Sequence, residues 1–166
     1  MATFQPAPGR GAALDAAWSP DGAGVVSACS DGSVVATDLK TQTSTRLAEH
    51  AAAPARAVRH VPAISAFASG GWDKTVRLVD PRQPATASVA LATPDRVYSL
   101  DASATDTRVL AACAERHLVL WDARNTSQAV WSGASPLSFQ TRAVALFDRG
   151  FVVAGVDGRV YVAHQN

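Results

Sequence analysis

Short apolar segments alternate with polar turns along the chain, and the alternation has a fixed spacing. Four acidic turns mark it, and each begins 42 positions after the one before: Asp31-Gly32, Asp73-Lys74, Glu115-Arg116 and Asp157-Gly158. A period in the forties is typical of propellers and other repeat folds, in which one supersecondary unit is copied and stacked. The spacing therefore predicts a repeat protein.

An apolar segment follows each acidic turn, and a run ending in small residues precedes it. The segments after the turns are Val34–Ala36, Val76–Leu78, Leu118–Leu120 and Val160–Val162. The runs before the turns are Val25–Cys29, Phe67–Gly71, Val109–Cys113 and Val152–Gly155. Because the segments are short, rich in β-branched residues and bounded by turns, we expect strands. The Asp-Gly pairs suit tight hairpins, since glycine accepts a positive φ.

The repeat divides the chain into four units after a flexible lead-in at residues 1–11. We expect blades at about 12–50, 51–92, 93–134 and 135–166, built from antiparallel strands as in a β-propeller. Outer strands are expected at Ser44–Ala48, Ala87–Leu91 and Gln128–Ser132, whereas the fourth unit has none after Arg159–His164. The predicted fold class is all-β, with Trp121 and Trp131 in the blade cores.

Composition narrows the possible functions. The 166 residues carry a net charge of +1, which predicts no strong electrostatic attraction to nucleic acid. The chain has no apolar run of the roughly 18 residues that a membrane span needs, so we expect no membrane insertion. Cys29 and Cys113 occupy the same register two repeats apart. We therefore expect them to be unpaired, buried thiols, as in an intracellular protein.

Several motifs, taken together, resemble a known family. The unit endings Thr37-Asp38, Val79-Asp80 and Trp121-Asp122 are similar to the WD dipeptide, and Trp18–Gly22 resembles the first-strand turn of WD repeats. Six further motifs occur in family order: Gly71–Val76, Pro94–Tyr98, Ala114–His117, Ser135–Leu137, Gln140–Arg142 and Asp157–Val160. The chain thus resembles the WD-repeat mRNA export factors of the Rae/Gle type, and the Bub-type mitotic checkpoint propellers are close relatives.

This resemblance implies a seven-bladed family fold, of which the chain matches the second to fifth blades. It also implies a partner, a nucleoporin that carries a GLEBS motif, and a place at the nuclear pore in the nucleus, with the cytoplasm as a second location. Arg142 and Arg159 match family arginines implicated in this binding. An Arg fork pairs bidentately with a carboxylate of an acidic peptide. The alternative for Arg159 is a salt bridge between blades.

The sequence also indicates further candidate partners and one further candidate contact residue. The Bub-type relationship implies checkpoint kinases with GLEBS segments as alternative partners. RNA within the export complex is a further expectation, through an arginine patch shared with the nucleoporin. Trp72 lies in a hairpin turn, where an aromatic side chain marks a contact surface or packs on the adjacent blade.

One set of polar residues resembles a hydrolytic triad. A catalytic interpretation of His50, Ser69 and Asp73 would need an accessible nucleophile and an oxyanion hole. The resemblance implies instead a structural hydrogen-bond network between strands, as WD repeats have at these positions. The histidines and cysteines lack metal-ligand spacing, and no phosphate-binding loop is present. We therefore predict a non-enzymatic scaffold with no cofactor and no metal.

Overall fold

The computed structural model describes residues 11–164, and the strands in this part form four antiparallel sheets. The first sheet holds β1 (Ala13–Trp18), β2 (Gly24–Cys29), β3 (Ser33–Asp38) and β4 (Ser44–Glu49). The second holds β5 (Ala55–Val61), β6 (Ala66–Gly71), β7 (Thr75–Val79) and β8 (Val89–Ala92). The third holds β9 (Val97–Ala102), β10 (Arg108–Cys113), β11 (His117–Asp122) and β12 (Trp131–Ala134). The fourth holds β13 (Thr141–Phe147), β14 (Gly150–Gly155) and β15 (Val160–His164).

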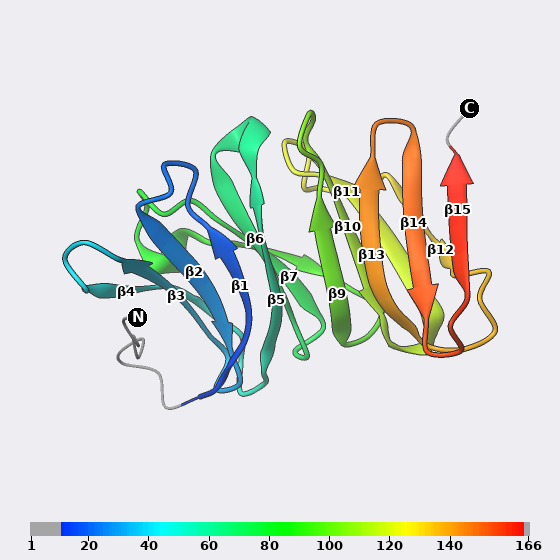
Figure 1. The fold of residues 1–166 in the computed structure, drawn as a ribbon, viewed down its shortest axis with the longest axis horizontal. Coiled ribbons are helices and arrows are strands. Elements are labelled where there is room, and N and C mark those ends of the chain that lie inside the picture. Colours follow the sequence, from blue (N-terminus) through cyan, green and yellow to red (C-terminus); the bar gives the residue numbers. More distant parts are fainter. Residues whose placement is uncertain (1–10, 165–166) are drawn as a thin grey trace.

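In each sheet the strands pair in chain order, so every sheet is a meander from an inner to an outer strand. Figure 1 shows the sheets side by side, from the first sheet (β1–β4) at one end to the fourth sheet, with β15, at the other. Short 3-10 turns at Pro62–Ile64, Ala85–Ala87 and Ala114–Arg116 interrupt the connections. Among the described residues, no helix is long and apolar enough to span a bilayer. The expected all-β, blade-like architecture is confirmed, and the expected lead-in lies, apart from Gly11, outside the described residues.

The acidic turns form tight hairpins, as predicted. The second residue of each turn adopts a positive φ, at Gly32 (90°), Lys74 (61°), Arg116 (63°) and Gly158 (75°). Two of the four hairpins therefore place a long side chain in the left-handed region that glycine prefers. The third turn differs from the others, because Glu115, the residue before Arg116, also has a positive φ of 54°.

The outer strands differ most from the sequence prediction. β12 covers Trp131–Ala134, about three residues later than the expected Gln128–Ser132. Its register is set by pairing with β11, where Leu120 lies opposite Trp131. Trp121 is buried as expected, but the prediction for Trp131 is wrong, because 39% of its surface remains exposed.

Neighbouring sheets pack face to face through apolar clusters. In the joint between the third and fourth sheets, Leu110 and Leu118 meet Phe151 and Val153. Similar clusters join the first to the second sheet and the second to the third. Cys29 and Cys113 are unpaired and buried, one in β2 and the other in β10. Burial of apolar surface between blades is the main force expected to stabilise this stack.

Polar side chains of the inner strands tie each sheet to the next. The Asp15 carboxylate accepts hydrogen bonds from the Val58 backbone N–H at 3.1 Å and from the Arg59 guanidinium at 2.6 Å. One joint further on, Arg59 lies 3.8 Å from Asp101, and Asp101 accepts the Leu146 N–H at 2.6 Å. These carboxylates satisfy backbone donors on the free edges of inner strands, which would otherwise have no partner in the sheet.

Candidate functional site

A buried hydrogen-bond network lies beneath the turn between β6 and β7. His50 Nδ1 is 2.8 Å from Asp73 Oδ1, and His50 Nε2 is 3.0 Å from Ser69 Oγ. Asp73 also accepts the Thr75 hydroxyl at 2.8 Å and the Ala51 N–H at 3.2 Å. The structure thus brings together the three residues singled out from the sequence. It connects the segment that enters the second sheet with that sheet's central hairpin.

The electrostatics of this network favour a neutral histidine beside an ionised carboxylate. Burial lowers the pKa of His50 by more than the Asp73 carboxylate raises it. Burial alone would raise the pKa of Asp73, but hydrogen bonds from His50 and Thr75 outweigh it and hold that pKa below its ordinary value. Nδ1 of a neutral His50 therefore donates to Asp73, while Nε2 accepts from the Ser69 hydroxyl.

Burial decides what this network is able to do. Ser69 and His50 are both 0% exposed, so neither reaches solvent in this conformation. A nucleophilic serine must contact its substrate, with oxyanion donors beside it. The geometry therefore favours cross-strand stabilisation over hydrolysis, because a buried polar group without partners would destabilise the sheet.

Trp72 lies next to this network, at the surface. The residue is 38% exposed, and its indole meets the Tyr98 ring edge-on at 6.1 Å between centroids. The Arg96 guanidinium lies 5.8 Å from the indole centroid, in a cation–π contact. Trp72 therefore packs on the adjacent third sheet and still presents a face to solvent, which combines the two interpretations of its sequence position.

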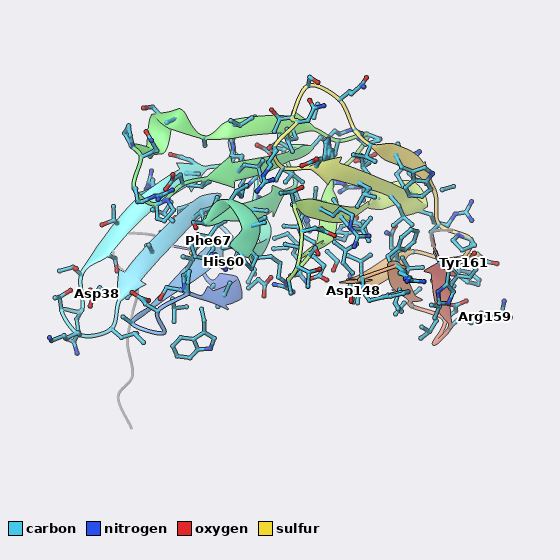
Figure 2. All side chains as sticks on the ribbon, turned by 90° about the horizontal axis from the view of Figure 1, so that it is seen from above. Asp38, His60, Phe67, Asp148, Arg159 and Tyr161 are labelled. Carbon is cyan, nitrogen blue, oxygen red and sulfur yellow. The ribbon has the colours of Figure 1, made fainter. Side chains whose placement is uncertain are left out.

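Arg142 and Arg159 lie at the same end of the fourth sheet. Arg142 begins the exposed part of β13, and no ion pair or hydrogen bond involves its side chain within residues 11–164. The Arg159 side chain is 73% exposed and lies 3.7 Å from Asp157 of its own turn. Figure 2 labels Arg159 close to Tyr161 on the fourth sheet, far from Asp38 of the first. The Arg159 contact is local, and no pairing with a neighbouring sheet's turn occurs in the described part of the chain.

All these residues lie at one end of the sheets, which we call the acidic-turn end. It comprises the β2–β3, β6–β7, β10–β11 and β14–β15 turns and the connections that lead from each outer strand to the next sheet. Because successive strands reverse direction, these segments must all lie at the same end.

The family model described as "WD domain, G-beta repeat" matches residues 6–36. "Poly(A)+ RNA export protein" of Schizosaccharomyces pombe is 34% identical over 155 residues, which are 90% of this chain and 43% of that protein. The chain is a WD-repeat protein. It is also similar to "Mitotic checkpoint protein bub-3" of Caenorhabditis elegans, with 33% identity over 137 residues, 81% of this chain and 39% of that one.

This WD-repeat protein spans less than half the length of these two curated relatives. Among solved structures, the computationally designed Ika4 protein matches with a TM-score of 0.80 and 20% identity, over 100% of this chain and 99% of that one. This likeness concerns the fold alone. Homology to export and checkpoint proteins and a four-sheet propeller architecture therefore agree with the resemblance inferred from the motifs.

Some surface residues of the WD-repeat protein were missed by the motif analysis. Phe139 and Val156 are both exposed and flank Arg142 and Arg159 in the chain at the acidic-turn end. Arg96 was quoted only as part of a motif, although it covers the Trp72 ring. The sequence could have pointed to these residues, because an aromatic or apolar side chain in a turn is costly to leave in water without a binding partner.

No group of three or more metal-ligating side chains occurs in residues 11–164. At this end the exposed acidic turn residues Asp31, Glu115 and Asp157 are also present, and the fourth sheet groups Arg142 and Arg159 with exposed Phe139 and Val156. Such a surface is suited to binding a peptide that carries carboxylates and apolar residues.

Proposed function

We propose that this protein is a non-enzymatic scaffold that binds a GLEBS-type nucleoporin segment and acts in mRNA export through the nuclear pore. The observation that carries the proposal is the pair of exposed arginines, Arg142 and Arg159, beside exposed Phe139 and Val156. Similarity to an RNA export protein supplies the functional context. A nuclear location at the pore follows from the same proposal.

The chemistry of the surface favours an acidic segment with apolar anchors. Arg142 has no partner within the described residues, and the Arg159 contact to Asp157 is long at 3.7 Å and largely in solvent. An exposed ion pair of this kind contributes little, so exchanging Asp157 for a partner's carboxylate costs little. The guanidinium groups can then form bidentate pairs, while Phe139 and Val156 lose water-exposed apolar surface.

A checkpoint role is the second candidate, in which the partner is a GLEBS segment of a checkpoint kinase. The similarity to the bub-3 protein favours it. The same arginines would serve both roles, because both segments belong to one class of acidic peptide. Comparing the affinities of a nucleoporin peptide and a kinase peptide for the same protein distinguishes the two candidates.

The binding test compares charge-reversed variants at the two ends of the sheets. Arg159→Glu and Arg142→Glu should each weaken binding of a fluorescent nucleoporin GLEBS peptide at least tenfold, as expected for loss of a charged hydrogen-bonded pair. Arg124→Glu is the matched control, because Arg124 is exposed in the β11–β12 connection at the opposite end. Equal affinities for the wild type and both acidic-turn variants would refute the site.

A single-stranded RNA competitor extends the same anisotropy assay. If RNA and peptide share the arginine surface, RNA should displace the peptide, and the displacement should weaken as salt is raised. Displacement that persists in Arg142→Glu and Arg159→Glu would place any RNA contact elsewhere on the protein.

A further inference from the structure

A groove of about 270 Å³ lies between the first and second sheets, at the end of the sheets opposite the acidic turns. Its floor is apolar and includes Val26 and Ala36 of the first sheet and Phe67 of the second. Asp21 of the β1–β2 turn and Asp38 at the end of β3 lie at its rim, and both are exposed. Figure 2 labels Phe67 and Asp38 on these neighbouring sheets. Both sheets have four paired strands, so the groove belongs to an internal joint of the stack.

This joint is hollow because two of its residues are small. Gly24 and Ala36 lie two repeats before Arg108 and Leu120. In the joint between the third and fourth sheets, the Arg108 guanidinium donates to two backbone carbonyl oxygens at the β13–β14 turn, at 3.0 and 3.2 Å, and Leu120 is buried. Glycine and alanine leave the corresponding space between the first and second sheets unfilled. Apolar atoms that line such a space lack packing partners, which the side chain of a ligand can supply.

The rim of the groove is negatively charged. The Ser19 hydroxyl donates to Asp21, and the Thr41 N–H donates to Asp38 at 2.8 Å, and these hydrogen bonds lower the pKa of both carboxyls. Both carboxylates are therefore ionised at neutral pH. No Lys or Arg of residues 11–164 lines the groove, and Lys40, although it shares a turn with Asp38, is not part of the lining. The groove thus combines an apolar floor with an acidic rim that no lining cation neutralises.

The next joint provides an internal comparison. A groove of about 300 Å³ lies between the second and third sheets at the same end, with Asp80 one repeat after Asp38. There the Asp80 carboxylate accepts from the Arg82 guanidinium through both oxygens, at 2.8 Å each, and Arg124 also lines the groove. The second groove therefore presents no excess of negative charge, and the acidic rim distinguishes the first.

We propose that the groove between the first and second sheets binds a basic peptide segment of a partner protein. One large apolar side chain of the peptide lies on Phe67 in the groove, and flanking Lys or Arg side chains pair with Asp21 and Asp38. An engineered apolar cavity of about 150 Å³ accommodates benzene, so this groove has room for one aromatic or branched side chain. Burial of that side chain supplies most of the affinity, and the rim carboxylates select a cationic sequence. The same carboxylates disfavour RNA and anionic membranes.

The groove and the proposed GLEBS surface share no residue and lie at opposite ends of the sheets. Arg142 and Arg159 face the acidic-turn end, whereas Asp21 and Asp38 lie at the other. The two ends then take peptides of opposite charge, which allows one chain to hold two partners at once. Either site can fail in experiment without the other.

The first test varies the peptide. Fluorescein-labelled peptides with Lys and Arg on both sides of a central Phe, Leu or Met are titrated with the wild-type protein, and anisotropy reports binding. The best of the three should bind at least tenfold more tightly than the same peptide with a central Ala, and binding should weaken as salt is raised. A peptide with Glu in place of Lys and Arg should not bind the groove. Absence of binding by all three peptides at millimolar protein, or equal binding of the Ala-centred peptide, overturns the proposal.

The second test varies the groove. Ala36→Leu introduces the residue found at this position in the second and third sheets, so it should fill the groove without lowering Tm and weaken peptide binding about tenfold. Asp21→Asn/Asp38→Asn keeps an acceptor oxygen for each turn but removes both charges, and should weaken binding about fivefold or more. Asp148→Asn is the matched control, because Asp148 is an exposed turn residue at the same end of the fourth sheet, and it should bind like the wild type. Unchanged affinity in Ala36→Leu or in the double variant overturns the proposal.

Hydrogen–deuterium exchange locates the bound peptide independently. The basic peptide should slow exchange at residues 19–26 and 36–41, which border the groove, and leave residues 71–75 and 155–160 at the acidic-turn end unchanged. Arg159→Glu should not alter affinity for this peptide. Protection confined to the acidic-turn end would show that the basic peptide binds elsewhere and would overturn the assignment.

Discussion

Asp73 is the residue on which the acidic turn of the second sheet depends. Its carboxylate accepts hydrogen bonds from the His50 ring, the Thr75 hydroxyl and the Ala51 N–H, and Arg77 lies 3.9 Å away. Side chains that share one acceptor in a buried site cannot easily find substitutes when it is removed. The role of this network is therefore structural in our account.

The first prediction follows from these contacts. Asp73→Ala removes the carboxylate that accepts from both His50 and Thr75 and leaves these two only their mutual contact of 3.2 Å, so it should lower the free energy of unfolding by about 2–4 kcal/mol. Glu115→Ala is the matched control, because Glu115 is exposed at the same repeat position in the third sheet. It should change stability by less than about 0.5 kcal/mol. Urea unfolding measures both, and equal losses would argue against the network.

A second residue-level prediction concerns pH. The pKa of His50 is lowered by burial, so below the ordinary histidine pKa of about 6.5 the unfolded chain binds a proton that the folded chain does not. Stability is therefore fully present above pH 6.5 and should fall as the pH drops toward 5. The lowered pKa of Asp73 acts in the same direction below its ordinary value.

His50→Gln should make the loss of stability between pH 6.5 and 5 smaller. Part of the slope should remain, because burial also lowers the pKa of His60. Thermal unfolding at closely spaced pH values provides the measurement. A slope that is unchanged in His50→Gln would mean that His50 is already protonated in the folded protein.

At the scale of secondary-structure elements, the hairpin turns carry the repeat. The second residue of each turn has a positive φ and is glycine in the first and fourth sheets but Lys74 and Arg116 in the second and third. In the third turn Glu115 has a positive φ as well. A side chain in this region costs conformational energy that glycine avoids. The surroundings of the two glycines also differ. A Cβ at Gly32 would lie 2.5 Å from the His50 carbonyl oxygen, whereas nothing lies within 4 Å of one at Gly158.

Introducing glycine at a turn position with positive φ should therefore stabilise the protein, and removing glycine from such a position should destabilise it. Lys74→Gly should stabilise the protein by about 0.5–1 kcal/mol, because its exposed contact with Asp95 at 3.5 Å contributes little. Gly158→Ala should destabilise by about 1 kcal/mol through the backbone alone. Gly32→Ala should cost more, because it adds a clash. Denaturant midpoints rank the three variants, and a Gly32→Ala variant no less stable than Gly158→Ala would contradict this ranking.

The same elements show what sequence could and could not reveal. The central hairpins were predictable, because a buried strand, an acidic turn and a second buried strand leave a strong apolar pattern. The outer strand β12 was not, because Trp131–Ala134 lie at the rim, where pairing with β11 and not periodicity sets the register. Trp131 stays partly exposed for the same reason. It rests on Phe151 of the next sheet, at 5.8 Å between centroids.

The candidate site was predictable in part. The family resemblance singled out Arg142 and Arg159, and the hairpin position singled out Trp72; the structure places all three at the acidic-turn end. The sequence did not reveal that Arg96 covers the Trp72 ring, because this contact joins turns from different sheets. Nor did it reveal that Arg159 lies beside Asp157 of its own turn, which requires side-chain positions.

At the scale of the whole molecule, the four sheets form one continuous stack. Each sheet has an acidic-turn end and an opposite end, and the two ends differ in character. Seen from above, the sheets follow a curve, with the first and fourth sheets at its two extremes (Figure 2). The buried network, the half-exposed Trp72 and the two exposed arginines all lie at the acidic-turn end. The hairpins at the other end, such as Ser19–Gly24, close with local hydrogen bonds. Our account therefore assigns recognition of the acidic peptide to one end only.

Hydrogen–deuterium exchange of the protein with and without a GLEBS peptide tests this assignment most directly. We predict slower exchange at residues 71–75, 137–142 and 155–160 when the peptide is bound, because binding orders these turns and excludes water. The opposite-end segments 19–24, 38–43 and 122–126 should be unchanged. Protection confined to the opposite-end segments, or no protection at a saturating peptide concentration, would contradict the account.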